Sequence, residues 1–304
     1  MSNEPPRTGR PPFGSWRARD RRFALERPVV LGILNLTPDS FSDGGRWRDP
    51  GAALAHARRM CDEGADLVDV GGESTRPGAA AVDAAEEWRR IGTVVAALAA
   101  EAVPVSVDTT KPEVAARALD AGAVVVNDVS ALSASPGIAD LCARTGAGLV
   151  LMHMRGDPRT MQDDVSYGAL VPEVARYLEG RAALARERGV PADGIVVDPG
   201  IGFGKSPEGN LELIAGCGTF AGLGYPVLVG PSRKSFIGEL LGLPLRERLE
   251  GTLAACVAAL ERGARLFRVH DVAAVRRALD LAERIRRTTP SGTVPPVPAG
   301  MPGG

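Results

Sequence analysis

The chain has 304 residues, of which 44% are hydrophobic, and its 36 basic and 37 acidic residues leave a formal net charge of −1. A chain of this length can form two ordinary domains or one large α/β barrel, which commonly needs about 250 residues. The balanced charge argues against general binding to nucleic acid or to a membrane surface, so any basic site must be local.

Targeting and redox features favour a cytoplasmic protein. The first residues contain Arg and Pro but no apolar core of a secretory signal, and no apolar run reaches the roughly 18 residues that span a membrane. The four cysteines are widely separated and form no CxxC pair, so the sequence predicts neither a disulfide framework nor a zinc ribbon. We therefore expect reduced thiols, as is usual in the cytosol.

Both ends of the chain differ in composition from its middle. Residues 1–14 and 288–304 are rich in Pro and Gly, so we expect a disordered leader and a disordered tail around one domain over residues 15–287. Trp16 and Phe23 stand among arginines at the start of that domain, where the sequence favours a short hairpin or strand.

From Val29 onward, short apolar runs alternate with Ala-rich segments of helical periodicity. The expected strands occupy residues 29–34, 66–70, 103–107, 123–127, 148–152, 195–198, 226–230 and 265–269. The expected helices occupy residues 50–63, 83–101, 112–120, 136–145, 168–189, 207–217, 233–262 and 272–287. Eight strands that are each followed by a helix predict an α/β fold, a single (β/α)8 TIM barrel. The alternative is an open doubly wound sheet, but its G-x-G-x-x-G signature does not follow the first strand.

Several helix ends are marked by residues with known preferences. Asp49-Pro50 predicts an N-cap followed by proline at the first helical position. The segment 233–262 contains Gly242 and Pro244, which predict a break in that helix. Glycines that end helices are expected at Gly64, Gly122 and Gly189.

Functional side chains stand at the carboxyl-terminal ends of the expected strands. In a barrel these ends meet at one face, where active sites lie, so the sequence predicts one site to which all eight strands contribute. The residues at or just after these ends include Asn35, Asp69, Asp108, Asn127, Met152, His153, Asp198, Gly230, Arg233, Lys234, Arg268 and His270.

These side chains fall into two chemical classes. The first is rich in acceptors and suits a small heterocycle with N–H donors, such as an aminopyrimidinone ring; it comprises Asp69, Asp108, Asn127 and Asp198. The second is cationic and suits a phosphate or carboxylate; it comprises Arg76, Lys205, Arg233, Lys234, Arg268 and His270. Barrels often bind phosphate near their seventh and eighth strands, which supports an anionic substrate here.

Two other features carry less weight. Gly204-Lys205-Ser206 resembles the end of a P-loop, but Pro199 occupies the position of the first glycine. The three histidines are far apart and form no HExxH motif, so a dedicated protein metal cage is not expected. Mg²⁺ held mainly by substrate phosphates and by one amide such as Asn35 fits the sequence better.

Nine motifs, in a fixed order over about residues 21 to 287, resemble one family. They are GILNLTPDSFSDGG (32–45), DVGGESTRPG (69–78), SVDTTKP (106–112), NDVSA (127–131), LMHMRGDPRTMQ (151–162), DPGIGFGK (198–205), SRKSFIG (232–238), RLEGT (248–252) and RVHDV (268–272). Together they resemble the dihydropteroate synthases, the folate-pathway enzymes that sulfonamides target. Pro231 departs from the small residue that this family favours before SRKS, although it removes no reactive group.

The resemblance implies a transferase reaction. 6-Hydroxymethyl-7,8-dihydropterin pyrophosphate would lose pyrophosphate, and the amine of p-aminobenzoate would replace it to give 7,8-dihydropteroate. The resemblance places the pterin ring against Asp69, Asp108, Asn127, Asp198 and Lys234. It places the pyrophosphate against Asn35, Arg76, Arg268 and His270, with Asn35 also binding Mg²⁺.

The same resemblance assigns the second substrate and the catalytic groups. p-Aminobenzoate is expected among Thr75, Pro77, Phe203 and Ser235, while Phe41 and Asp43 belong to a mobile first loop. Met152 and Gly230 complete the expected substrate-binding set. The groups expected to act in catalysis are Asp43, Arg76, Lys234, Arg268 and His270.

Two alternatives remain at this point. A methyltetrahydrofolate-dependent methyltransferase also uses a pterin-binding barrel, but it has no evident use for the cationic pyrophosphate cluster. A non-catalytic pterin-binding relative would be signalled by loss of the first loop or of Arg268 and His270, and all of these are present. The expected partners are the small-molecule substrates and a second copy of the chain, with the homodimer packed through the helices near 247–287.

Overall fold

The computed structural model describes residues 14–37, 49–75 and 78–288, and its centre is a sheet of eight parallel strands. The strands pair in the order β8-β7-β6-β5-β4-β3-β10-β9. Their bounds are β3 Val29–Asn35, β4 Leu67–Gly71, β5 Val105–Asp108, β6 Val125–Asp128, β7 Gly148–Met152, β8 Ile195–Asp198, β9 Leu228–Val229 and β10 Leu266–Val269. A parallel bridge between Val197 and Val227 joins the two ends of the sheet. The sheet therefore closes into the predicted (β/α)8 barrel, and the open-sheet alternative is wrong.

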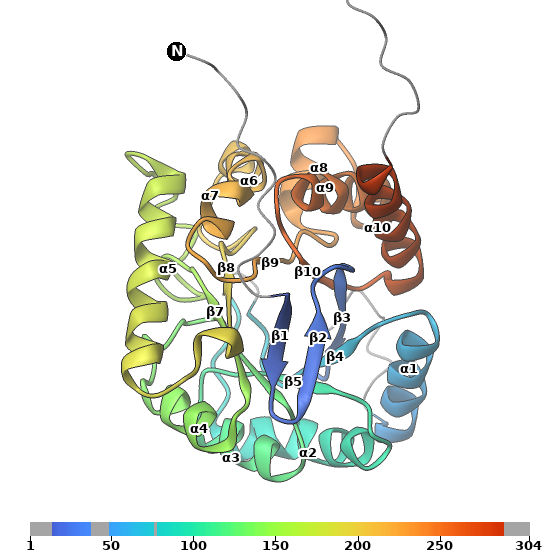
Figure 1. Ribbon diagram of the computed structural model, residues 1–304, viewed down its shortest axis with the longest axis vertical. Helices are drawn as coiled ribbons and strands as arrows, with labels where there is room; N and C mark the ends of the chain where they lie inside the picture. Colours follow the sequence, from blue (N-terminus) through green and yellow to red (C-terminus); the bar gives the residue numbers. More distant parts are fainter. Residues whose placement is uncertain (1–13, 38–48, 76–77, 289–304) are drawn as a thin grey trace, which may run out of the picture.

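Helices surround the strands in chain order, as the view along the barrel shows (Figure 1). They are α1 Pro50–Asp62, α2 Ala84–Ala100, α3 Pro112–Asp120, α4 Gly137–Thr145, α5 Leu170–Glu187, α6 Pro207–Ala215, α7 Cys217–Ala221, α8 Ser235–Leu241, α9 Leu249–Glu261 and α10 Val272–Arg287. The predicted break in 233–262 is confirmed, because Gly242 takes a left-handed conformation with φ of 67° and ends α8. The expected helix 207–217 instead stops at Ala215, and α7 follows it.

Alternation along the strands divides the apolar core into two parts. In β3, Val30 and Leu34 pack outward with the surrounding helices. Val29 and Leu31 belong to the second cluster, which fills the barrel interior. This alternation follows from the period of two in a strand, and burial of both faces explains why the strands read as continuous apolar runs.

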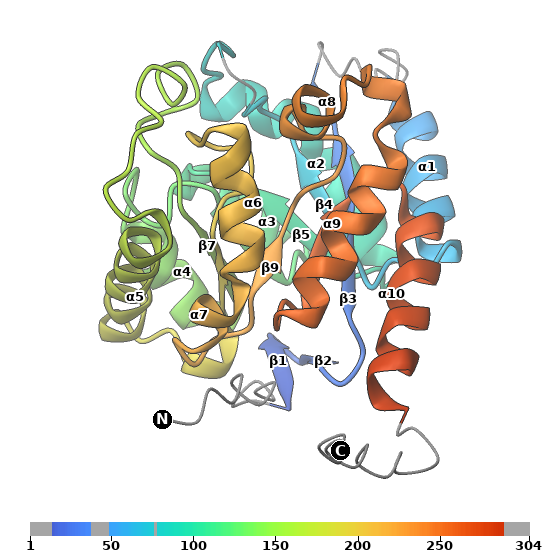
Figure 2. The ribbon, with the colours of Figure 1, turned by 90° about the horizontal axis from the view of Figure 1, so that it is seen from above.

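A two-stranded hairpin closes the floor of the barrel, which confirms the prediction for the segment around Trp16. It consists of β1 Ser15–Ala18 and β2 Arg21–Ala24, paired antiparallel, and it lies at the end opposite α8 (Figure 2). Trp16 is fully buried, and its indole Nε1 donates to the carbonyl of Gly194 at 3.1 Å. A Cβ at Gly148 would lie 2.8 Å from the indole, so only glycine allows this close approach.

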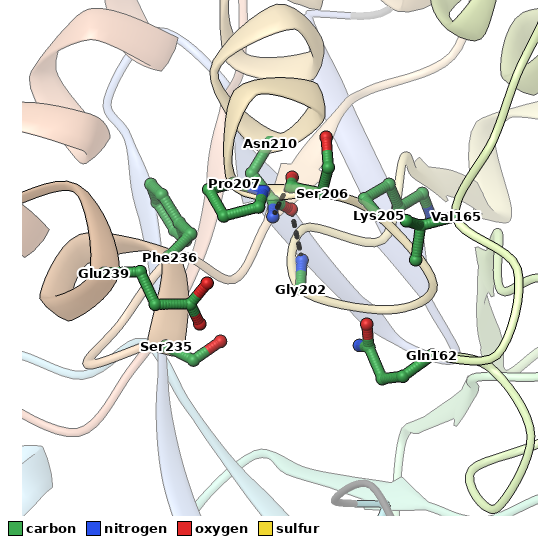
Figure 3. A pocket seen from close by; sticks show the side chains of 10 residues that line it. All are labelled: Gln162, Val165, Gly202, Lys205, Ser206, Pro207, Asn210, Ser235, Phe236 and Glu239. Atoms are coloured by element: carbon green, nitrogen blue, oxygen red, sulfur yellow. Dashed lines mark hydrogen bonds between the residues drawn. The ribbon is translucent and has the colours of Figure 1, made fainter.

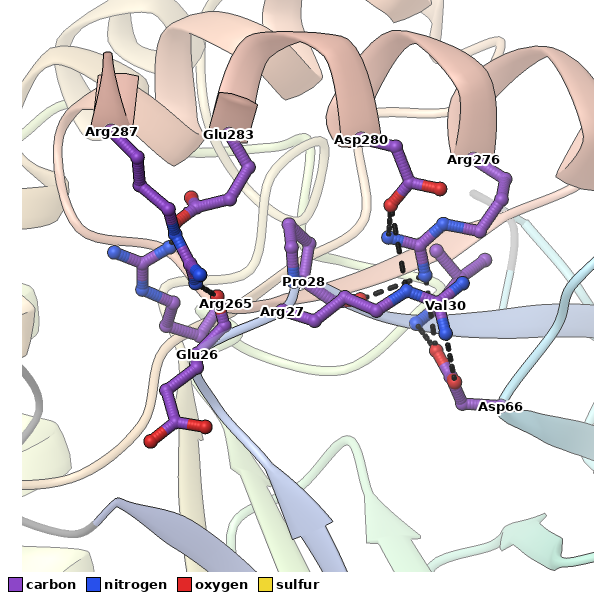
Figure 4. A network of polar contacts seen from close by, with 10 residues as sticks. All are labelled: Glu26, Arg27, Pro28, Val30, Asp66, Arg265, Arg276, Asp280, Glu283 and Arg287. Carbon is purple, nitrogen blue, oxygen red and sulfur yellow. Dashed lines mark hydrogen bonds and ion pairs between the residues drawn. The ribbon is translucent and has the colours of Figure 1, made fainter. Parts of the chain in front are cut away.

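Charged side chains fasten α10 to the same end of the barrel (Figure 4). Arg276 pairs with Asp280 at 2.7 Å and with Asp66 at 3.2 Å, and it also donates to the carbonyl of Pro28. Asp66 in turn accepts from the backbone N–H of Val30 at 2.8 Å. This network fixes the point where β3 begins, and it leaves the opposite face of the barrel for the polar strand ends. None of the helices in the described ranges is long and apolar enough to cross a membrane.

Candidate active site

Strand register brings the predicted site residues to one level at the barrel mouth. Asn35 of β3 is opposite Gly71 of β4, Gly71 is opposite Asp108 of β5, and Asp108 is opposite Asn127 of β6. Because all these strands are parallel, the residues that end them face the same rim. The ends of these strands therefore lie side by side at one rim of the barrel.

Arg268 of β10 lies at the centre of the site and binds two buried carboxylates. Its Nε donates to Asp69 at 2.6 Å, and its Nη2 donates to Asp108 at 2.8 Å. Asn127 donates from Nδ2 to the same oxygen of Asp69 at 3.3 Å. The guanidinium that the resemblance assigns to the pyrophosphate thus contacts the carboxylates assigned to the pterin.

This ion-pair network affects the pKa values of Asp108 and Arg268. Burial raises the pKa of Asp108, while the charge of Arg268 opposes that rise. Burial also disfavours the charged guanidinium, but Asp69 and Asp108 outweigh it and raise the pKa of Arg268. Arg268 therefore stays charged and compensates the carboxylates in the deepest part of the site.

The loop after β8 holds Asp198 by a tight turn. Asp198 accepts from the N–H of Gly200 at 2.7 Å, and burial raises the pKa of its carboxyl group to about 6. Gly200 has a φ of +72°, and a Cβ there would lie 1.9 Å from the carbonyl oxygen of His153, so the turn requires glycine. The sequence motif that begins with Asp198 therefore folds as a tight turn that holds the Asp198 carboxylate at the end of β8.

Lys205 ends that loop and is buried rather than presented to substrate. Its Nζ lies 2.9 Å from Nδ1 of His153 and donates to the carbonyls of His153 and Gly200. Burial lowers the pKa of Lys205 to about 7, and burial together with the nearby Lys205 lowers the pKa of His153 to about 3. The prediction that Lys205 belongs to the cationic group that binds an anion is wrong. Its ammonium group is buried and joins the loop after β7 to the loop after β8.

The aromatic ring of Phe203 contacts other predicted substrate-binding residues. Phe203 packs with Met152, Val129 and Met161 in a small apolar cluster. The Nζ of Lys234 lies 3.9 Å from the centroid of the Phe203 ring, a cation–π contact. The structure thus brings together three residues that the sequence predicted as substrate-binding: Met152, Phe203 and Lys234.

His270 and the start of α8 form another part of the site. Nδ1 of His270 lies 3.1 Å from Oγ of Ser232, which also accepts from the backbone N–H of His270. Arg233 makes a bidentate ion pair with Asp271, so its charge is engaged beside the strand. Ser235 is exposed at the first residue of α8. Ser232, whose hydroxyl orients His270, was missed by the sequence analysis.

A second group that the sequence analysis missed anchors the loop after β4. Lys111 contacts Glu73 and the fully buried Glu87 at 2.6 Å each. Glu73 also accepts from the N–H of Val82, across the loop that includes Thr75. Burial raises the pKa of Glu87, and Lys111 opposes that rise. A charge pattern alone could not reveal this group, because Lys111 is separated from Glu73 by 38 positions.

We expect Lys111→Met to lower the free energy of unfolding by about 3 kcal/mol, because it leaves the Glu87 carboxylate buried without its counter-charge. The double variant Glu87→Gln/Lys111→Met removes that charge and is expected to recover part of the loss. Urea unfolding of the two variants measures the difference. Equal stability of the single and double variants would contradict the assignment.

The remaining predicted residues differ in how far the structure describes them. Asn35 and Thr75 are half-buried at the rim, and a Cβ at Gly230 would lie 3.8 Å from Cβ of Arg268. Four predicted residues lie outside the described part of the chain: Phe41, Asp43, Arg76 and Pro77. Most of the leader and of the tail lies outside it as well.

Asn35 is the rim residue whose side-chain oxygen could reach a metal ion. Oδ1 of Asn35 would lie 3.4 Å from a Cβ at Gly71, so the glycine leaves space beside this amide oxygen. Within the described ranges, no group of three or more His, Cys, Asp or Glu side chains could hold a metal ion.

Comparison with known proteins agrees with this geometry. Residues 31–270 match the family model described as pterin binding enzyme, and the chain belongs to that family. Two curated relatives, from Synechocystis sp. and Escherichia coli, are each 45% identical to it over 86% and 88% of this chain and 91% and 94% of their own lengths. Both are named dihydropteroate synthase, and the chain belongs with the dihydropteroate synthases within the pterin-binding enzymes.

Solved structures give the same assignment. The dihydropteroate synthase of Yersinia pestis in complex with a sulfonamide drug superposes with a TM-score of 0.87 at 42% identity, covering 90% of this chain and 100% of that one. The enzyme of Xanthomonas albilineans with 4-aminobenzoic acid gives 0.83 at 47% identity, with the same coverage. These similarities confirm the predicted fold and family.

Proposed function

We propose that this transferase condenses 6-hydroxymethyl-7,8-dihydropterin pyrophosphate with p-aminobenzoate to 7,8-dihydropteroate and releases pyrophosphate. The observation that carries the proposal is the buried set of Asp69, Asp108, Asn127 and Asp198 beside Arg268 at the mouth of the barrel. Acceptors of this kind match the N–H edges of a pterin ring.

The ring would bind among the buried acceptors. Asp108 and Asp198 would accept its N–H groups, Asn127 would supply both a donor and an acceptor, and Lys234 would donate to a ring acceptor. When the bond between the pterin methylene carbon and the pyrophosphate oxygen breaks, positive charge develops on the ring. The same carboxylates would stabilise that charge, since they are held in place before the reaction begins.

The leaving group would meet the cationic side of the site. Arg268 and His270 would bind the departing pyrophosphate, with Ser232 holding the His270 ring in place. Asn35 would contribute an amide oxygen to Mg²⁺, which when bound offsets the charge of the pyrophosphate. Arg76 would join them from the loop after β4.

The second substrate, p-aminobenzoate, would lie over the ring of Phe203. The ring of p-aminobenzoate would lie against Phe203 and Pro77. Its carboxylate would meet Ser235 at the first turn of α8, with Thr75 nearby. The arylamine nitrogen would bond to the pterin methylene carbon as the bond to the pyrophosphate oxygen breaks, and the nitrogen would then lose one proton. Because the arylamine is itself a fair nucleophile, no covalent enzyme intermediate is needed. Asp43 and Phe41 of the first loop would exclude water from the cationic pterin.

Pterin binding should weaken in acid, because Asp198 can accept a pterin N–H fully only as a carboxylate. Its pKa is raised by burial to about 6, so affinity should fall as the pH is lowered through that value. Fluorescence titration with 6-hydroxymethylpterin, which carries no titrating phosphate, measures this directly. Asp198→Asn should bind more weakly and lose the part of this dependence that Asp198 contributes, while Asp108, whose pKa burial raises to about 7, keeps the other part. A wild-type affinity that stays constant from pH 7 to pH 5 contradicts the prediction.

We also propose a homodimer in the cytoplasm. Leu281 and Ile285 of α10 are 60% and 65% exposed, which leaves an apolar strip on one of the late helices. All four cysteines are free thiols, and three of them are buried, as suits a reducing compartment. Light scattering should give the mass of two chains, and a monomer would overturn the dimer.

Parallel assays separate the synthase from its two alternatives. The protein would be supplied either with the pterin pyrophosphate, p-aminobenzoate and Mg²⁺, or with methyltetrahydrofolate and a thiol or corrinoid acceptor. Dihydropteroate formation in the first assay alone supports the synthase. Methyl transfer in the second assay would instead support the methyltransferase. Pterin binding without turnover in either assay would support the non-catalytic relative.

A further inference from the structure

A cavity of about 370 Å³ opens beside the proposed p-aminobenzoate site (Figure 3). It lies between the loop that follows β7, the loop that follows β8, and the first turns of α6 and α8. Its lining shares Ser235 with the proposed carboxylate site, and Gly202 is the residue before Phe203. The lining residues are Gln162, Val165, Gly202, Lys205, Ser206, Pro207, Asn210, Ser235, Phe236 and Glu239. A group attached to the carboxyl end of the arylamine would therefore point toward this cavity.

Several polar groups of the lining are already satisfied within the protein. Oδ1 of Asn210 accepts from the N–H of Gly202 at 2.6 Å, and its Nδ2 donates to the carbonyl of Ser206 at 2.9 Å. Lys205 directs its ammonium group at His153 and two carbonyls, so it offers the cavity its aliphatic stem. The Asn210 amide and the Lys205 ammonium group are thus engaged with other groups of the protein.

Glu239 supplies the charge that remains on the described lining. It is an exposed carboxylate on α8, four residues after Ser235, and its side chain lies next to that of Ser235 in Figure 3. The amide of Gln162 stands on the opposite wall, and Phe236 and Pro207 provide apolar surface. A short methylene chain that ends in an ammonium group matches this combination of walls and charge.

We propose that this cavity is an accessory subsite for a cationic substituent carried by the arylamine on its carboxyl side, with Glu239 as the residue that selects its charge. The proposal rests on the proposed synthase function. The volume of the cavity is within the range of small-ligand pockets, which begins at about 300 Å³. An anionic substituent would meet the like charge of Glu239 and would be disfavoured.

The test compares three 4-aminobenzamides with N-(2-aminoethyl), N-(2-hydroxyethyl) and N-(carboxymethyl) tails. The kcat/KM value of each amide is divided by that of p-aminobenzoate for the same variant, so that a loss of activity common to all substrates cancels. In the wild type we expect the cationic tail to be preferred to the anionic one by about tenfold, since an exposed charge contributes about twofold to fivefold for each sign. Glu239→Gln should remove most of that ratio, and Glu239→Lys should invert it.

The control is Glu212→Gln, which removes a carboxylate from α6 outside the cavity and should leave the ratio unchanged. Val165→Phe narrows the cavity and should reduce use of all three amides relative to p-aminobenzoate. The subsite proposal is wrong if the ratio of the cationic to the anionic amide is the same in the wild type and in Glu239→Gln. It is also wrong if Val165→Phe converts the three amides as well, relative to p-aminobenzoate, as the wild type does. Failure of the synthase assignment is distinguishable, because p-aminobenzoate itself would then not be converted by the wild type.

Discussion

Replacing Arg268 by methionine is expected to lower kcat/KM for the pterin pyrophosphate by about 10²- to 10³-fold. Two losses combine in this variant. The leaving pyrophosphate loses a cation, and the carboxylates of Asp69 and Asp108 lose the guanidinium that lies 2.6 and 2.8 Å from them. Initial rates at varied pterin concentration measure the effect.

Arg268→Lys is the matched variant, because it keeps the positive charge but cannot donate to both carboxylates in the planar geometry of arginine. We expect it to recover only part of the activity lost in Arg268→Met. If Arg268→Met retained activity within about threefold of the wild type, the guanidinium would have no role in the transition state. The assignment of the leaving-group site would then be wrong.

Replacing Trp16 by alanine is expected to lower the free energy of unfolding by about 3–5 kcal/mol, the usual cost of removing a large buried aromatic side chain. The indole is fully buried under the strands and also donates to the carbonyl of Gly194. Because the hairpin lies at the floor, kcat/KM at low temperature should change by less than about twofold. Urea unfolding and the product assay measure the two quantities.

Trp88→Ala is the control for this experiment, since Trp88 is only half-buried on α2. The same change of residue should cost roughly half as much there, because less apolar area leaves water in the wild type. Equal losses for Trp16→Ala and Trp88→Ala would contradict the role of the hairpin as the floor of the barrel.

The barrel could be predicted from sequence because burial of both strand faces produces apolar runs that alternate with helical periodicity. Strand limits near proline were harder to predict. Residues 226–230 were expected to form a strand, but only Leu228–Val229 does so. Pro226 has no N–H and cannot donate to the sheet, and Pro231 imposes the same limit at the other end. A single bridge at Val227 therefore joins this part of the barrel to β8.

The site could be predicted in its composition but not in its contacts. Topology alone brings the ends of parallel strands together, so residues such as Asp108 and Asp198 could be placed at the mouth without coordinates. The direction of a long side chain depends on partners that are remote in sequence. Arg268 folds onto Asp69, which lies 199 positions away, and Lys205 turns to His153, 52 positions away. Neither contact has a local signal in the sequence.

The most direct test of the proposed function is a product assay on the purified full-length chain. The pterin pyrophosphate, p-aminobenzoate and Mg²⁺ are mixed with the protein, and dihydropteroate and pyrophosphate are quantified in the same samples. The synthase assignment predicts that the two products appear in equal amounts and only when both substrates are present. Pyrophosphate release without dihydropteroate, or no release at all from a protein that still binds the pterin, would contradict it.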